Sequence, residues 1–304
     1  MKYVDIAGIK ASAVALGCMR MEALDKKGVN AVLSGAMRAG INFFDHADIY
    51  GRGSSEEKFG GFLKENPSVR KDIFIQTKCG IANGGYDFSK NHVLEAVNGS
   101  LKRLNTDYVD FLLLHRPDTL MEPDEVAAAF DELERAGKVR NFGVSNFNPW
   151  QIKLLKTCVK QPIAANQLQL SVTEAGMITS GFNVNMKNDA SAVRDGGVLE
   201  YCRIEGITIQ AWSPLQYGFF GGTYVGNREK FPALNAKFDE LSVKYGVSPS
   251  AIAFAWLLRH PAKIQVVAGS MNPVHIAEAA AGADVTLTRS EWYGIYFAAG
   301  HTLP

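Results

Sequence analysis

Four side chains that can transfer protons or donate hydrogen bonds stand at the ends of three apolar stretches. The segment FFDHADIYG, residues 43–51, carries Asp45 and Tyr50, and two further apolar runs end at Lys78 and His115. Each residue alone could be structural, as a buried ion pair or a hydrogen-bonded core histidine. Their joint placement at strand ends favours a catalytic site.

The four residue types fit the reduction of a carbonyl group, which needs a hydride on carbon and a proton on oxygen. An ammonium stabilises a neighbouring phenolate, so Lys78 is expected to lower the pKa of Tyr50 and make it a better proton donor. Asp45 would keep that ammonium charged and oriented in a dry site. His115 could donate a hydrogen bond to the substrate oxygen.

These side chains can meet only if the strands that carry them lie side by side. Short apolar stretches alternate with helical patterns, and several are apolar on both faces, which is typical of parallel strands covered by helices. Eight strands are expected, at 12–19, 41–45, 73–78, 108–115, 140–145, 163–170, 207–213 and 264–270. This repeat predicts a (β/α)8 barrel. A doubly wound sheet is the alternative, but no G-x-G-x-x-G turn follows the first strand.

Helix signals lie between the strands. Ser54 and Glu57 resemble a capping box, and apolar stripes run from Val93 to Leu104 and from Val126 to Leu133. Further helices are expected at 148–158, 197–205, 233–246 and 248–260. Residues 1 to about 10 should form a hairpin that closes the barrel bottom. Two long irregular loops, 171–196 and 216–232, should lie at the C-terminal face, where barrel active sites occur.

Composition limits the class of protein. The chain has 304 residues and a formal net charge of +1, which argues against binding nucleic acid or an anionic membrane by bulk electrostatics. No apolar run approaches about 20 residues and no signal peptide is evident, so a cytoplasmic protein is expected. The cysteines lack C-x-x-C spacing, so reduced thiols are favoured over a disulfide framework or a metal site. One barrel domain can fill 1–304, and the oligomeric state stays open.

Six motifs occur in order along nearly the whole chain, namely GINFFDHADIYG, TKCG, LLLHRPD, GKVRNFGVSNF, ANQLQLS and AWSPL. Together they resemble the signatures of the aldo-keto reductase superfamily, and two of them are similar to a bacterial branch of predicted NADP-dependent oxidoreductases. The resemblance implies a catalytic tetrad of Asp45, Tyr50, Lys78 and His115. It also implies an NADP(H)-dependent reductase of aldehydes or ketones.

The same resemblance implies the residues that bind the cofactor. Ser145, Asn146 and Gln167 would hydrogen-bond the nicotinamide carboxamide, and Trp212 would stack on the ring. The pyrophosphate path would follow Ser213, Pro214 and Leu215. The adenosine 2′-phosphate would lie at a loop and helix start, an arrangement that suits anions; the residues implied in this part of the cofactor site are Gly269, Ser270, Asn272, His275 and Glu278.

Some positions depart from the family pattern. The family commonly has arginine at the position of His275, so NADPH preference is expected to be weaker than usual and to sharpen at acidic pH, where imidazole is charged. His46 replaces a small hydroxyl residue and either tunes the tetrad, contacts substrate or lies behind the strand. Cys18 and Met19 are expected at the pocket floor, and Arg20 at the mouth or in a surface salt bridge.

Two rival functions remain open at this point. A lyase could form a Schiff base on Lys78, although a lysine paired with Asp45 stays protonated. A non-catalytic, cofactor-binding barrel subunit would keep the same residues without turnover. Aromatic residues suggest an apolar substrate pocket, although each could be packing instead; they are Phe219, Phe220, Tyr224, Trp292 and Tyr293.

Overall fold

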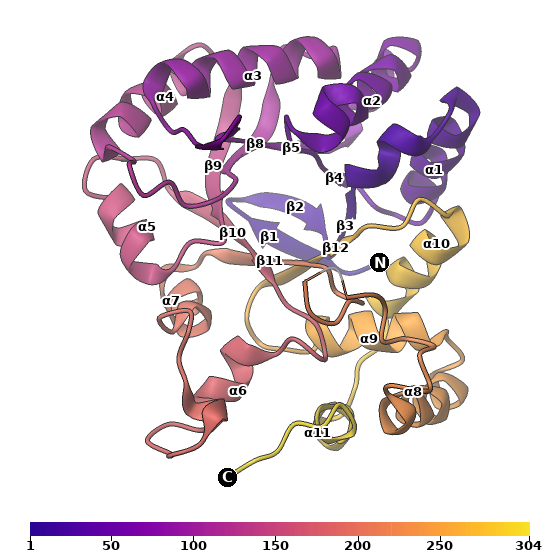
Figure 1. The fold of residues 1–304 in the computed structure, drawn as a ribbon. Helices are drawn as coiled ribbons and strands as arrows, with labels where there is room; N and C mark the ends of the chain where they lie inside the picture. The colour runs from indigo at the N-terminus through magenta and orange to yellow at the C-terminus, as the bar shows by residue number, and fades with distance from the viewer. Residues whose placement is uncertain (220) are drawn as a thin grey trace.

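Eight parallel strands close into a barrel in the computed structural model, which describes residues 1–219 and 221–304 (Figure 1). In chain order they are β3 (Val14–Gly17), β4 (Phe43–Asp45), β5 (Phe74–Cys79), β8 (Val109–Leu114), β9 (Val139–Ser145), β10 (Ile163–Gln169), β11 (Thr208–Trp212) and β12 (Ile264–Ala268). Each strand pairs with the next, and β12 pairs with β3. All eight coincide with predicted strands, so the (β/α)8 prediction is confirmed and the doubly wound alternative is wrong.

Helices surround the barrel, as Figure 1 shows. They are α1 (Lys26–Arg38), α2 (Ser54–Glu65), α3 (Lys90–Leu104), α4 (Pro123–Arg135), α5 (Pro149–Leu155), α6 (Gly176–Phe182), α7 (Val198–Glu205), α8 (Pro232–Tyr245), α9 (Pro249–Leu258), α10 (Pro273–Gly282) and α11 (Arg289–Ala298). Short 3-10 helices are η1 (Met19–Ala23), η2 (Tyr50–Gly53), η3 (Pro67–Asp72) and η4 (Asp189–Ser191). Within the described chain, no single helix is long and apolar enough to cross a membrane; α8 and α9 pass that test only as a pair bent by 91°.

Two local predictions about these elements were wrong. The N-cap of α2 is Gly53, and Ser54 is already the first helical residue, so the Ser54–Glu57 capping box does not form. The segment 171–196 is not irregular throughout, because it contains α6 and η4. The apolar side chains of α6 explain its helix, since Ile178 is buried.

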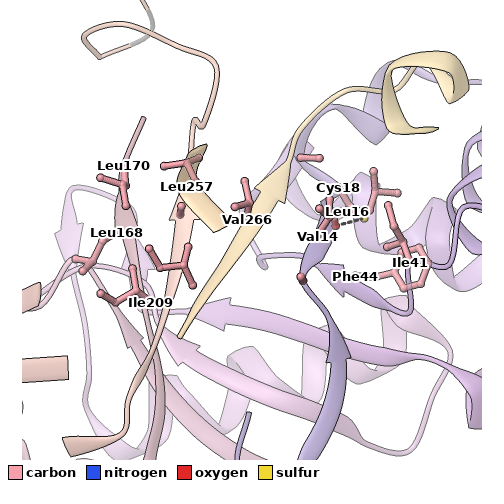
Figure 2. Packing of buried hydrophobic residues seen from close by; sticks show 14 of the residues in the cluster. Val14, Leu16, Cys18, Ile41, Phe44, Leu168, Leu170, Ile209, Leu257 and Val266 are labelled. Atoms are coloured by element: carbon pink, nitrogen blue, oxygen red, sulfur yellow. Dashed lines mark hydrogen bonds between the residues drawn. The ribbon is translucent and has the colours of Figure 1, made fainter. Parts of the chain in front are cut away.

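A hairpin of β1 (Tyr3–Ile6) and β2 (Ile9–Ser12) closes the bottom of the barrel, as predicted. Its buried residues Ile6 and Ala11 pack against Phe43 and Phe111 inside the barrel. Another small hairpin, β6 (Ile81–Ala82) with β7 (Gly85–Tyr86), follows β5. The larger core lies between the strands and the surrounding helices; Figure 2 shows buried side chains such as Leu16, Ile209 and Val266.

Two adjacent glycines in α2 give a test of the helix packing. A Cβ at Gly60 would collide with the backbone oxygen of Arg103 in α3, whereas a Cβ at Gly61 would meet nothing within 4 Å. Gly60→Ala should therefore force the helices apart and lower the free energy of unfolding by about 1–3 kcal/mol. Gly61→Ala, the matched control, should raise it by up to about 1 kcal/mol because alanine is the better helix former. Chemical denaturation measures both changes, and equal effects would contradict this close contact.

Candidate active site

The four residues expected at the strand ends meet at the C-terminal mouth of the barrel. Lys78 Nζ donates to Asp45 Oδ2 at 2.9 Å, to the backbone oxygen of His46 at 2.7 Å and to the Tyr50 hydroxyl at 2.9 Å. An ammonium has three N–H donors, so all of them are used. Because Lys78 donates to the phenol oxygen, the hydroxyl hydrogen of Tyr50 remains free for another acceptor.

The chain after β4 places Tyr50 above Lys78. The backbone N–H groups of His46 and Asp48 donate to the carbonyls of Gln76 and Lys78, so the segment stays aligned with β5 beyond the end of β4. It then turns through η2, where Gly51 has a φ of 56° and glycine avoids the penalty for a left-handed backbone.

Burial and charge act in opposite directions on this site. Burial raises the pKa of Tyr50 and Lys78 lowers it, but the pKa remains above its ordinary value. Lys78 therefore lowers the pKa of Tyr50, as expected, but burial has the larger effect and the ammonium only limits the rise. Burial lowers the pKa of Lys78, but Asp45 and Tyr50 outweigh it and the pKa is raised. At neutral pH both groups keep their protons, as an acid and its supporting cation must.

His115, the residue that follows β8, is the fourth member of the tetrad. Its ring lies edge-on to Tyr50, with 6.0 Å between the ring centroids and an interplanar angle of 83°. Burial, followed by the charges of Lys78 and Arg116, holds the pKa of His115 well below its ordinary value. The imidazole is therefore neutral near pH 7, and a neutral imidazole can still donate one N–H.

A cavity of about 760 Å³ opens beside the tetrad. Lys78 is fully buried behind Tyr50. Nearly all the other predicted site residues line this cavity, namely Asp45, Tyr50, His115, Ser145, Asn146, Gln167, Trp212, Ser213, Pro214, Leu215, Gly269, Ser270, His275 and Glu278.

Hydrogen bonds fix the side chains expected near a nicotinamide. Asn146 Nδ2 donates to Ser145 Oγ at 2.8 Å, and its Oδ1 accepts from Trp212 Nε1 at 3.1 Å. Asn146 and Ser213 directly follow β9 and β11, with φ values of 62° and 53°. Left-handed backbone is costly for serine and persists where surrounding structure imposes it, often at functional sites.

The far end of the cavity carries positive and hydrogen-bonding groups. Arg20 Nη1 donates to the backbone oxygen of Gly269 at 3.1 Å. A Cβ atom added to Gly269 would lie only 3.0 Å from the same nitrogen. Arg20 thus faces the cavity, which is one of the two alternatives predicted for it. Met19 lines the cavity as well, as predicted. Cys18 is fully buried beneath the surface, so its placement at the pocket floor was wrong.

The loop before α10 has the geometry of an anion site only in part. Ser270 Oγ lies 3.4 Å from His275 Nδ1, and both line the cavity. Asn272 instead caps α10, accepting from the Val274 N–H at 2.9 Å, and lies outside the cavity lining of the described chain.

The aromatic residues divide between the cavity and the core. Phe219 lines the cavity, whereas Tyr224 is fully buried and donates to the backbone oxygen of Pro214 at 2.7 Å. Trp292 and Tyr293 pack against each other on α11, and Phe220 lies outside the described residues. No described residue of 171–196 lines the cavity, but Ser171 donates to the backbone oxygen of the cavity-lining Gln216 and Glu174 accepts from the Gly218 N–H.

Sequence reasoning named Gln167 but missed the layer of buried amides below the tetrad to which it belongs, which we call the amide layer. It consists of Gln76, Gln167, Gln210 and Gln265, which come from four strands and are at most 4% exposed. Gln167, Gln210 and Gln265 are register partners in adjacent strands, and Gln76 is the register partner of Asp45. A single glutamine inside an otherwise apolar strand was the available signal, because an unpaired buried amide is costly.

His46 points away from the cavity and lies behind β4. Its ring packs edge-on against Phe59, with 4.6 Å between centroids, and neither ring nitrogen has a hydrogen-bond partner among the described residues. Burial and the Lys78 charge lower the pKa of His46 to about 3. Contact between this side chain and substrate is therefore excluded.

The buried imidazole makes stability depend on pH. Between pH 6.5 and about 3 the unfolded chain binds a proton at His46 that the folded chain does not, so the folded state loses stability as the pH falls through this window. Between pH 7 and pH 5 the imidazole should lower the free energy of unfolding by about 2 kcal/mol, and His46→Phe should not show this part of the decrease. Denaturation of both proteins at the two pH values measures it; identical losses would contradict the buried neutral imidazole.

Known proteins match this fold and this arrangement of residues. The family model described as "Aldo/keto reductase family" matches residues 13–295. A 6-dehydroglucose reductase from Agrobacterium fabrum is 37% identical over 88% of this chain and 86% of its own length. A second 6-dehydroglucose reductase, from Novosphingobium aromaticivorans, is 33% identical over 98% and 95%.

Solved structures agree on the architecture. An aldo/keto reductase from Klebsiella pneumoniae, in complex with NADP and acetate, superposes with a TM-score of 0.77 at 22% identity, covering 97% of this chain and 94% of that one. The family match, the two curated relatives and the tetrad at the mouth of a (β/α)8 barrel lead to one conclusion: this chain belongs to the aldo/keto reductase family.

Proposed function

We propose that the protein reduces an aldehyde or ketone to an alcohol with NADPH as the hydride donor. The observation that carries the proposal is the Tyr50 hydroxyl, held 2.9 Å from a buried ammonium at the wall of a cavity of about 760 Å³. A protonated phenol with a free hydrogen, next to a cavity, is the group that a carbonyl oxygen needs as it gains charge.

Each tetrad residue has a distinct part in this chemistry. The cofactor, when bound, supplies the hydride that adds to the carbonyl carbon. Tyr50 transfers its proton to the carbonyl oxygen, and Lys78 stabilises the phenolate that results. Asp45 keeps Lys78 charged and in place. The neutral His115 donates to the same oxygen and lowers the energy of the developing charge.

The lining of the cavity supports NADP(H) as the cofactor. Trp212 offers an aromatic face held by Asn146, and aromatic faces suit a flat heteroaromatic ring. At the other end, the Arg20 guanidinium occupies space that any side chain at position 269 would need. Ser270 and His275 line the same part of the cavity. A guanidinium is the preferred partner of a phosphate, so Arg20 compensates for the absence of arginine at position 275.

The mouth of the cavity and the relatives support a small carbonyl substrate. Ile49, Ile81 and Phe219 give it apolar walls, while Arg116 adds a cation whose guanidinium carbon lies 5.7 Å from the Trp212 ring centroid. Both curated relatives described above are named 6-dehydroglucose reductase. A sugar-derived aldehyde therefore belongs in the first panel of substrates, beside simple aldehydes and diketones.

The rival functions are less well supported. A Schiff base needs a neutral amine, but Lys78 is fully buried, carries three hydrogen bonds and has a raised pKa. Borohydride trapping of a substrate on Lys78 would favour the lyase. A non-catalytic cofactor-binding subunit would bind NADPH without oxidising it in the presence of any carbonyl of the panel.

Removing the proton donor tests the proposal. Tyr50→Phe should lower the rate of carbonyl reduction by about 10²-fold or more, because general-acid catalysis is lost. The rate is followed as the loss of NADPH absorbance with the substrate panel. The dissociation constant for NADPH, measured by calorimetry, should change little and serves as the control for folding. Undiminished turnover would remove Tyr50 from the role of proton donor.

Arg20 tests the phosphate end of the cavity. Arg20→Met should lower kcat/KM for NADPH about tenfold while leaving kcat/KM for NADH nearly unchanged, since only NADPH carries the 2′-phosphate. Arg38→Met removes the same charge from an exposed position at the end of α1 and is the matched control. An equal loss with both cofactors would place Arg20 elsewhere than the 2′-phosphate.

A further inference from the structure

The amide layer connects the catalytic carboxylate to the cofactor side of the cavity. Asp45 Oδ1 accepts from Gln76 Nε2 at 2.6 Å and from Gln167 Nε2 at 3.1 Å. An ionised carboxylate can only accept hydrogen bonds, so both glutamines must turn their NH₂ groups toward Asp45. The Asp45 carboxylate thereby sets which end of each amide points toward it.

Gln210 occupies the centre of this layer. Its Oε1 accepts from Gln76 Nε2 at 2.8 Å and from Gln167 Nε2 at 3.2 Å. Its Nε2 donates to Gln76 Oε1 and to Gln265 Oε1, both at 2.9 Å. Gln265 in turn donates to the backbone oxygen of Ser12, at the end of the bottom hairpin. A chain of amides therefore runs from the barrel floor to the tetrad.

Counting donors shows what Gln167 can offer to a ligand. Both N–H groups of Gln167 are used, one by Asp45 and one by Gln210. Its Oε1 has no hydrogen-bond partner among residues 1–219 and 221–304, and the side chain lines the cavity. Gln167 can therefore accept a hydrogen bond from a ligand but cannot donate one.

We propose that Gln210 is a positioning residue, which locks the Gln167 amide so that its carbonyl oxygen alone faces the cofactor. The inference rests on the proposed function and extends it, because it assigns a role to a residue that touches neither cofactor nor substrate. In this arrangement Gln167 selects a ring substituent that carries an N–H donor, as the nicotinamide carboxamide does. Without Gln210, Gln167 Nε2 keeps a single hydrogen bond, the 3.1 Å contact to Asp45. The amide can then rotate about that bond, so its Oε1 is no longer held toward the cofactor.

A pair of cofactors that differ in one donor tests this role. In the 3-acetylpyridine analogue of NADP⁺, a methyl group replaces the carboxamide NH₂ and removes the donor. The wild-type protein should bind NADP⁺ about tenfold more tightly than the analogue, the upper range for one hydrogen bond. In Gln210→Met, which is similar in size but cannot bond its neighbours, that ratio should fall below about twofold. Calorimetry gives the four dissociation constants.

Controls separate positioning from general damage to the barrel. Ile209→Val alters the neighbouring residue on β11, which belongs to the outer core, and should keep the tenfold ratio. If Gln210→Met does not fold, Gln210→Leu, which also lacks the oxygen that accepts from Gln167, should lower the ratio in the same way. A ratio that survives in the Gln210 variant, or that falls equally in Ile209→Val, would overturn the inference. Wild-type binding without discrimination would overturn it alone, whereas no binding of either dinucleotide would overturn the proposed function as well.

Discussion

The buried ion pair of Lys78 and Asp45 is the interaction on which the site depends. An ammonium without exposure to water is stable only if its donors are matched, and Lys78 meets this condition with a carboxylate, a backbone carbonyl and a phenol. Loss of any one partner would leave a charge or a donor unpaired in a dry interior. The same contacts that make the pair stable also hold Tyr50 at the cavity wall, so stability and chemistry share one set of bonds.

Sequence alone predicted the strands and the residues at their ends well, for a physical reason. A parallel barrel buries both faces of each strand, so apolar runs such as that ending at Lys78 are easy to recognise. The side chains that break those runs then lie at one end of the barrel by topology. The α1 helix was not predicted, although its buried residues have helical spacing, namely Val29, Val32, Leu33 and Ala36.

The sequence could not show which of two opposing effects on a pKa is larger, or which of two residues close in the chain faces the cavity. The pKa of Tyr50 depends on whether burial or the Lys78 charge is larger, and burial is set by the whole fold. Asn272 and His275 lie close together in the chain, yet one caps α10 and the other lines the cavity. The amide layer was missed for the same reason, because four glutamines far apart in sequence become partners only when the barrel closes.

The hairpin across the barrel floor has a consequence for the order in which the ligands of the proposed function bind. Because Ile6 and Ala11 close that end with apolar contacts, ligands reach the site through the cavity at the opposite end. The residues proposed to contact the nicotinamide belong to the strands or their ends, namely Ser145, Gln167 and Trp212. In contrast, Ile49 and Phe219 lie on loops above the strands. If the dinucleotide lies against the strands as proposed, a substrate bound above it covers it, and the nucleotide then has to enter first and leave last.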